Sequence, residues 1–221
     1  NGPAPVRTEV WIASDVNSLY IAFRAHDPEP EKIRARLTDR DAAYQDDFVG
    51  MVLDTFNDER RAFEFFVNPL GVQMDLTQSE MTGEEDDSWD AIWESAGRID
   101  DAGYTVEMRL PFSSLRFPRS TDGMTWGLDA IRMYPRDQRY RLAMHPLERG
   151  NNCYLCQASR IVGFVGVRPA RSLELDPTLT ASMTGERADF PSGELEDDDP
   201  EVEPGLTARW GVTPNLVLSA A

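Results

Sequence analysis

The chain has 221 residues, a formal net charge of −17 at pH 7, and 41% hydrophobic and 10% aromatic residues. This length and composition are typical of a folded protein with one large domain, or one domain and part of another, and no apolar run is long enough for a transmembrane helix. The strong negative charge argues against nucleic acid or an anionic lipid surface as the main partner.

Short runs of β-forming residues, separated by turn residues, follow one another through the first two thirds of the chain. They are Thr8–Ala13, Leu19–Ala25, Phe48–Thr55, Arg61–Val67, Val72–Thr77, Trp89–Ile99, Tyr104–Leu110 and Trp126–Met133. No amphipathic helix of three or more turns interrupts them. The pattern predicts an all-β domain, an antiparallel β-sandwich, over residues 1–135.

Residues 136–171 lose this pattern and are expected to form a connector, which holds the two cysteines Cys153 and Cys156. A local disulfide in an oxidising compartment is the first interpretation, and two free thiols are the second. A C-x-x-C pair is also half of a zinc site, but only His26 and His145 remain to complete it.

Strict alternation of apolar and polar residues marks the end of the chain. It runs over residues 172–184, stops in an acidic loop at 185–204, and returns on the opposite parity from Leu206 to Ala220 with one break at Val217. Soluble strands are usually about five or six residues long, whereas a membrane-spanning strand needs roughly nine to eleven alternating residues. We therefore expect residues 172–221 to be the first hairpin of an outer-membrane β-barrel, truncated before the other strands.

The alternative is a long edge hairpin that extends the sandwich, which is disfavoured because neither segment has the charges or bulges that protect exposed edges. Outer-membrane barrels have short periplasmic turns and long outer loops. The acidic loop is therefore expected to face outward, which leaves the sandwich in the periplasm and the hairpin in the outer membrane of the cell envelope.

Several segments carry, in a fixed order, the motifs of one family. They read T-E-V-W-I-A-S-D-V-N-S-L-Y-I-A-F-R-A-H-D-P-E-P-E-K-I-R-A-R-L-T-D-R-D, D-D-F-V-G-M-V-L-D-T-F-N-D, F-F-V-N-P-L-G-V-Q-M-D, S-W-D-A-I-W-E-S-A, G-Y-T-V-E-M-R-L-P-F-S-S-L-R-F-P and G-L-T-A-R-W-G-V-T-P-N-L. Over nearly its whole length the chain resembles the family-nine carbohydrate-binding-module-like domain, in the version that precedes an outer-membrane β-barrel in Gram-negative envelope proteins. The early D-G and W segment of that family is missing, and C-Y-L-C is not part of its pattern. The resemblance implies a β-sandwich and binding of the ends of sugar chains.

Sugar sites use aromatic rings as platforms for the apolar faces of the sugar. Trp89 and Trp93 are candidates for this platform, because a spacing of four puts both on one face of a strand. The alternative is that both are core residues, since tryptophans are usually largely buried. Trp11, Trp126 and Trp210 are expected to be packing residues, and Trp210 also suits the lipid-facing aromatic belt.

Polar residues that suit sugar hydroxyls cluster before one predicted strand and around the turn that follows its partner. They are Arg40, Asp41, Tyr44, Asp46, Asp47, Asn68 and Gln73. The alternative is that they satisfy turns and surface ion pairs.

Asp54, Asn57 and Asp58 offer hard oxygen ligands of the kind that calcium takes. Their spacing differs from the EF-hand pattern, and a hairpin turn needs Asn-Asp in any case. Calcium at these three residues is the single cofactor that the sequence suggests.

Evidence for catalysis is sparse. Glu94 and Glu107 lie on predicted strands and could form a carboxylate pair, but nothing separates them from surface acids. Axial ligands for haem would have to come from residues such as His26, Met51 and Met74, and Met at such positions is more often core.

We therefore expect a non-catalytic, periplasmic module that binds a glycan or polysaccharide and leads into an outer-membrane barrel. One alternative is a structural plug, gating or docking domain for the barrel, with an envelope protein as partner and no sugar binding. Another is the accessory domain of a glycoside hydrolase.

Overall fold

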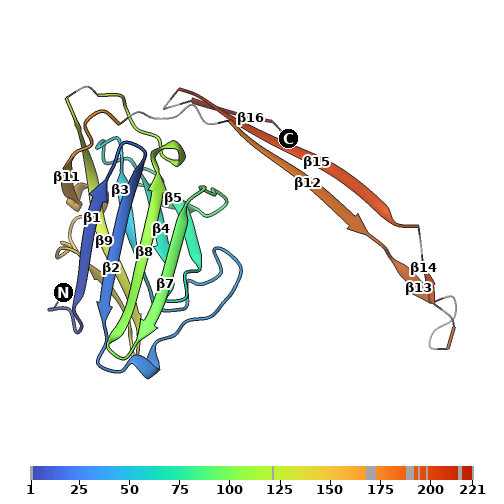
Figure 1. Ribbon diagram of the computed structural model, residues 1–221, viewed down its shortest axis with the longest axis horizontal. Helices are drawn as coiled ribbons and strands as arrows, with labels where there is room; N and C mark the ends of the chain where they lie inside the picture. The colour runs from blue at the N-terminus through green and yellow to red at the C-terminus, as the bar shows by residue number, and fades with distance from the viewer. Residues whose placement is uncertain are drawn as a thin grey trace. The chain divides into compact units, whose positions relative to one another are not determined.

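The computed structural model describes residues 2–120, 122–167, 173–187, 192–193, 195–197, 199–213 and 216–220 (Figure 1). The chain divides into two compact units, Asn1–Ala170 and Arg171–Ala221. No helix in these described ranges is both long and apolar enough to cross a membrane.

The smaller sheet of the first unit is antiparallel, with its strands in the order β1–β2–β8–β7. The strands are β1 (Thr8–Ser14), β2 (Ser18–His26), β8 (Gly103–Pro111) and β7 (Glu94–Asp100). β1 and β2 form a hairpin, and in its turn the Asp15 carboxylate accepts the backbone N–H groups of Asn17 and Ser18 at 2.7 and 2.8 Å.

The larger sheet is also antiparallel, in the order β10–β9–β3–β4–β5–β6, and β11 also pairs with β9. The strands are β10 (Arg139–Ala143), β9 (Met124–Pro135), β3 (Phe48–Asp54), β4 (Arg61–Val67), β5 (Gln73–Ser79), β6 (Glu84–Asp86) and β11 (Ser159–Gly163). Short 3-10 turns are η1 (Pro30–Lys32), η2 (Phe112–Ser114) and η3 (Leu155–Gln157).

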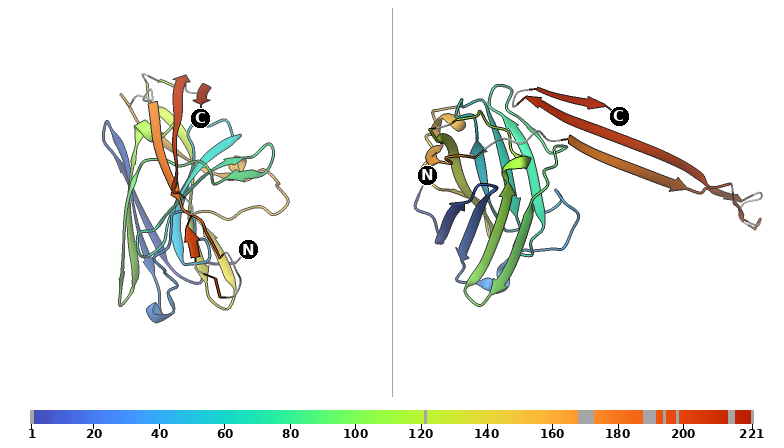
Figure 2. Two further views of the ribbon diagram at one scale, coloured as in Figure 1. Left: turned by 90° about the vertical axis from the view of Figure 1, so that its right-hand side faces the viewer. Right: turned by 45° about the horizontal axis from the view of Figure 1, so that its top comes forward.

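The two sheets form the two layers of a sandwich, which confirms the expected fold class (Figure 2). Inward-facing apolar residues of both sheets make one core, which includes Phe23, Met51, Phe65, Tyr104 and Trp126. Alternate residues of each strand supply this core, as the period of two predicts.

The larger sheet is buried on its outer face as well. All seven residues of β3 are buried, although only every second one can point toward the smaller sheet. A second apolar cluster covers the outer face, with members such as Phe48, Val52, Phe66 and Leu155. Residues 37–47 and 144–158 supply Ala43 and Leu155 to this cluster, so loops form a partial third layer here.

A buried ionic network ties the strand ends together. The Arg132 side chain on β9 is 1% exposed, and it donates to the backbone oxygen of His26 at 2.8 Å and to Asp27 Oδ2 at 3.3 Å. Arg136 also binds Asp27 and donates to Asp47 Oδ2 at 2.9 Å. The network therefore joins β2, β9 and the segment before β3.

Two segments differ from expectation. Residues 89–93 precede β7 as a loop, because the backbone N–H of Ala91 binds Asp75 at 2.7 Å and its oxygen accepts from Arg40 at 2.8 Å. The expected connector, 136–171, contains β10 and β11, which pair in succession along one edge of the long strand β9. Both errors arise from pairings with distant residues that local patterning does not encode.

The second unit contains a three-stranded antiparallel sheet in the order β12–β15–β16 and a short pair, β13–β14. The strands are β12 (Leu173–Ser182), β13 (Gly185–Arg187), β14 (Leu195–Asp197), β15 (Glu201–Thr213) and β16 (Leu216–Ala220). The segment expected as an acidic loop thus includes a strand pair and the start of β15. The expected single strand from Leu206 to Ala220 is two strands, with Val217 in β16 rather than in a continuous alternation.

The register of β12 and β15 puts apolar residues opposite one another on one face. The pairs are Leu173–Trp210, Leu175–Ala208, Pro177–Leu206, Leu179–Pro204 and Ala181–Val202. Five of the large apolar side chains on this face, Leu173, Leu175, Leu179, Leu206 and Trp210, are exposed. The alternation in the sequence therefore corresponds to a sheet with one polar face and one apolar face, and the apolar face is exposed.

Candidate functional site

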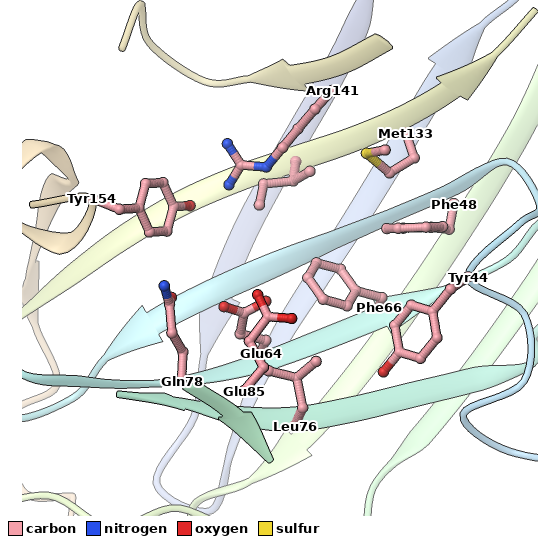
Figure 3. Close-up of a pocket in the computed structure, with 11 residues that line it drawn as sticks. Tyr44, Phe48, Glu64, Phe66, Leu76, Gln78, Glu85, Met133, Arg141 and Tyr154 are labelled. Atoms are coloured by element: carbon pink, nitrogen blue, oxygen red, sulfur yellow. The ribbon is translucent and has the colours of Figure 1, made fainter. Parts of the chain in front are cut away.

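A pocket of about 350 Å³ opens on the outer face of the larger sheet (Figure 3). Four aromatic side chains and four polar ones line it: Tyr44, Phe48, Phe66, Tyr154, Glu64, Gln78, Glu85 and Arg141. Apolar and polar groups contribute about equally to its lining, and its size is in the range of small-ligand sites, roughly 300–1,000 Å³.

The aromatic floor of the pocket depends on a glycine in β3. A Cβ at Gly50 would lie 2.3 Å from Cδ1 of Phe66, so a side chain at this position would displace the Phe66 ring. The ring centroids of Phe66 and Phe48 are 5.2 Å apart, and Tyr44 meets Phe48 edge to face at 6.3 Å. Such pairs hold ring orientations beyond what area burial alone provides.

The loop closed by the disulfide brings another aromatic residue, Tyr154, to the wall of the pocket. Cys153 and Cys156 form the local disulfide that the sequence favours, with Cα atoms 5.4 Å apart. Between them, the backbone N–H groups of Tyr154 and Leu155 each donate to the Glu80 carboxylate at 3.0 Å. This loop is therefore fixed to the end of β5, and Tyr154 reaches the pocket from it.

Some polar atoms in the pocket have no partner in the described part of the chain. The Tyr44 hydroxyl and the Gln78 side-chain oxygen are buried without a hydrogen bond. Glu64 is 6% exposed, and no described residue donates a hydrogen bond to its carboxyl group. Buried polar groups in native proteins nearly always form a hydrogen bond, so these atoms are candidates to form hydrogen bonds with a ligand.

Burial raises the pKa of Glu64 to about 8, and the charge of Glu85 adds to this effect. Arg141 lowers this pKa, because a nearby cation favours the ionised carboxylate. The negative charge of Asp129 raises it further. Strongly perturbed acids inside clefts are characteristic of functional sites.

Arg141 is already engaged by other groups at one end of the pocket. Its guanidinium carbon lies 4.8 Å from the centroid of the Tyr154 ring, and Nη2 lies 3.9 Å from Asp129 Oδ2. The Tyr154 hydroxyl donates to the same Asp129 oxygen at 2.8 Å. The buried Asp129 carboxylate therefore balances the charge of Arg141.

The structure places Trp93 in the sandwich core and Trp89 against it. Trp93 is 6% exposed and Trp89 is half-buried, and both pack against Phe65, with Trp89 also against Phe63. Trp93 thus offers no open ring face, and sugar stacking on the two rings stays a prediction from sequence.

Arg40 and Gln73 are brought together, but away from the pocket. Arg40 donates to Gln73 Oε1 at 3.2 Å and binds the buried carboxylate of Asp75, while Gln73 donates to the backbone oxygen of Trp93 at 3.0 Å. The carboxylates of Asp41, Asp75 and Asp90 approach within 4.8 Å of one another and could hold a metal ion. Arg40 lies against all three of them, so its guanidinium supplies the cation.

Asp46, Asp47 and Asn68 are also brought together, as internal braces. Asn68 Nδ2 donates to Asp46 Oδ2 at 3.2 Å, and Asp46 accepts from the Arg36 backbone N–H and side chain at 2.9 Å each. Asp47 accepts from the backbone of Arg34 at 2.9 Å and from Arg136. Of the predicted ligand-binding residues, only Tyr44 lines the pocket.

The predicted calcium ligands form the β3–β4 hairpin. Asp54 is buried and accepts the backbone N–H of Glu59 at 2.8 Å, and Asn57 adopts a left-handed φ of 51° in the turn. The Asp58 side chain accepts the N–H of Arg60 at 3.1 Å. These contacts account for the three residues as turn residues, and calcium binding at them stays a prediction.

The remaining candidates are also accounted for by local contacts. Glu94 pairs with Arg109 at 2.8 Å on the exposed face of the smaller sheet, and Glu107 lies across from Ala96 on the neighbouring strand. Met51 and Met74 are fully buried in the two apolar clusters.

Sequence reasoning missed Glu64, Phe66, Arg141 and Tyr154. One signal was available in R-A-F-E-F-F-V, where Glu64 is the only acid in a strand of bulky apolar residues. A carboxyl group in a strand buried on both faces is costly unless it has a role. No local signal indicates that residues 141 and 154 reach the same pocket.

Comparisons with known proteins agree with this fold. The family model described as carbohydrate family 9 binding domain-like matches residues 2–143. A crystal structure of a protein from Bacteroides uniformis, assigned to carbohydrate binding, is similar with a TM-score of 0.57 and 16% identity, covering 72% of this chain and 79% of that one.

A family 9 carbohydrate-binding module from Caldicellulosiruptor kristjanssonii was solved with cellotriose and with glucose. The cellotriose complex has a TM-score of 0.45 and 16% identity, covering 65% of this chain and 67% of that one. The glucose complex has a TM-score of 0.45 and 15% identity, covering 76% and 80%. No curated protein matches the chain at a significant level.

Proposed function

This chain belongs to the carbohydrate family 9 binding domain-like family, and on that premise we propose that it is a non-catalytic module that binds one sugar unit of a glycan in the outer-face pocket. The observation that carries the proposal is the meeting of open aromatic rings with unpartnered polar atoms in one cavity of about 350 Å³. Rings of Tyr44 and Tyr154 would stack on the apolar faces of the sugar. The Tyr44 hydroxyl, Gln78 and Glu64 would bind its hydroxyl groups.

Substitution Tyr44→Ala tests this site. It removes a ring and a hydroxyl from the pocket, so we expect the affinity for the best-bound sugar to fall at least about tenfold, or ~1.4 kcal/mol. The measurement is isothermal titration calorimetry of the full chain with glucose, amino sugars, uronic acids and short oligosaccharides.

Two comparison variants make the result specific. Trp11→Ala removes an aromatic ring that is 54% exposed on the smaller sheet, and it should leave the affinity unchanged. Trp89→Ala tests the platform suggested by the sequence. If Trp89→Ala abolishes binding and Tyr44→Ala does not, the site is at the tryptophans. If no sugar binds at all, the structural plug, gating or docking role replaces sugar binding.

We also propose that the module belongs to the cell envelope, with residues 172–221 as the first hairpin of an outer-membrane barrel and the sandwich in the periplasm. The open apolar face of β12 and β15 supports this, because membrane strands pair a lipid-facing apolar face with a polar one. The Cys153–Cys156 disulfide suits an oxidising compartment such as the periplasm.

Adjacent positions on β12 provide a matched test of the lipid-facing side. Leu179 is exposed on the apolar face, and Thr180 points to the other face, opposite Glu203 in the register. An arginine on the lipid face costs roughly 2–4 kcal/mol at the bilayer midplane. We expect Leu179→Arg to reduce co-sedimentation of the full chain with phosphatidylcholine vesicles by about 30-fold or more. Thr180→Arg should have little effect, and equal behaviour of the two variants would contradict the proposal.

A further inference from the structure

The charges in the outer-face pocket are unbalanced. Glu64 on β4 and Glu85 on β6 both line it, and neither forms an ion pair with any residue that the structure describes. Figure 3 shows their carboxyl groups next to one another near the middle of the pocket, and the electrostatic effect of Glu85 on Glu64 confirms that they are close. The two acids therefore share one space without a cation between them.

The nearest cation does not fill this gap. Arg141 influences Glu64, but it lies beyond ion-pair distance from it and within 3.9 Å of Asp129. The other titratable groups that face Glu64 are Asp129 from β9 and the phenols of Tyr44 and Tyr154, none of which is positive. The pocket thus has an open position for a positive group.

The surrounding rings favour the same kind of group. Phe48 and Phe66 line the pocket beside Tyr44, and Tyr154 lies across from them (Figure 3). Aromatic faces attract ammonium groups, by about 0.5–1 kcal/mol at exposed sites and about 2 kcal/mol or more where water is excluded. Carboxylates together with ring faces are the features that recognise an amine.

We propose that the pocket selects a sugar unit with a free, protonated amino group, whose ammonium binds between Glu64 and Glu85. This inference rests on the proposed sugar binding and specifies the class of sugar. A neutral sugar leaves the two acids without a partner, and a uronic acid adds a further negative charge to an acidic pocket. An N-acetylated amino sugar has the same ring but no positive charge, so it is the closest control ligand.

Proton release gives this inference a direct readout. Glu64 has a pKa of about 8, so it is mostly protonated at pH 7, and an ammonium bound beside it favours the ionised form. Ionisation of Glu64 on binding should then release most of one proton at pH 7, less the smaller fraction that the ligand amine takes up when it binds as an ammonium. Calorimetry in phosphate and in Tris measures this number, because the observed enthalpy changes with the ionisation enthalpy of the buffer.

The experiment compares glucosamine, N-acetylglucosamine, glucose and glucuronate on the full chain at pH 7. We expect glucosamine to bind at least tenfold more tightly than the other three and to be the only one that releases a proton. Glu64→Gln should lower the glucosamine affinity at least tenfold and abolish the proton release. Glu84→Gln, at an exposed position next to Glu85 on β6, should change neither.

The outcomes separate the two proposals. If glucose or N-acetylglucosamine binds as tightly as glucosamine without proton release, the amino-sugar preference is wrong and sugar binding stands. If Glu64→Gln keeps both the affinity and the proton release, the ammonium does not bind at Glu64 and the inference is overturned. If none of the four ligands binds, both proposals fail.

Discussion

Substitution Asp27→Ala is expected to lower the free energy of unfolding by about 3–5 kcal/mol, because it leaves a buried guanidinium without its counter-ion. Arg132 is 1% exposed and loses its only carboxylate partner, 3.3 Å away, among the described residues. Arg136 would keep Asp47 but lose its second partner. For a chain of this size each kcal/mol corresponds to roughly 2–4 °C, so the melting temperature should fall by about 6–20 °C.

An exposed ion pair provides the matched control for this variant. Glu94 also binds an arginine, Arg109 at 2.8 Å, but both side chains are in contact with water. In urea titrations of both variants, Glu94→Ala should lower the free energy of unfolding by less than about 1 kcal/mol. Asp27→Asn separates charge from hydrogen bonding, since the amide oxygen can still accept the Glu29 N–H. If the asparagine variant were as stable as wild type, the charge of Asp27 would not hold the network together.

Substitution Glu64→Gln is expected to stabilise the protein at alkaline pH. The folded-state pKa of about 8 lies above the value of about 4.3 in an unfolded chain, so the folded protein binds this proton more tightly. Stability from Glu64 is therefore complete below about pH 4 and is lost as the pH rises toward 8. At about 1.4 kcal/mol for each pKa unit, the total loss is about 3–5 kcal/mol.

Glutamine has nearly the same shape as glutamate and does not ionise, so the variant does not lose stability as the pH rises. We expect the variant to be more stable than the wild type by only about 1 kcal/mol at pH 5, and by about 3–5 kcal/mol at pH 9. Urea titrations followed by tryptophan fluorescence at pH 5, 7 and 9 measure the difference. Glu84→Gln, at an exposed neighbouring position, should show no such dependence on pH. A constant difference between Glu64→Gln and wild type would mean that Glu64 is solvated in the folded protein.

The loss of stability that Glu64 causes when it ionises is relevant to its proposed role in ligand binding. A carboxyl that has no hydrogen-bond or ion-pair partner among the described residues, in a buried strand, lowers stability at neutral pH, and a costly group of this kind is often retained because a ligand uses it. A gain in stability together with a loss of ligand binding in Glu64→Gln would identify such a trade-off.

Local patterning determined most of the strands of this protein. Arg61–Val67 is β4 as expected, and the turns at Asp15 and Asn57 occur where Asp and Asn predict them. The two-faced sheet of β12 and β15 also follows from the alternation in the sequence, because side chains on a strand point to opposite faces in turn. These features depend on neighbouring residues, and the sequence contains that information directly.

The candidate site depended on contacts between distant residues, which only the tertiary structure could decide. Alternation assigns Glu64 and Phe66 to the outer face of their strand, where water would be expected, but loops far along the chain cover that face. Tyr154 reaches the pocket because its loop binds Glu80, 74 residues earlier, and Trp93 is buried because the segment before β7 folds onto Asp75. The period of two in a strand specifies which face a side chain takes, whereas burial of that face is set by whatever segment packs on it.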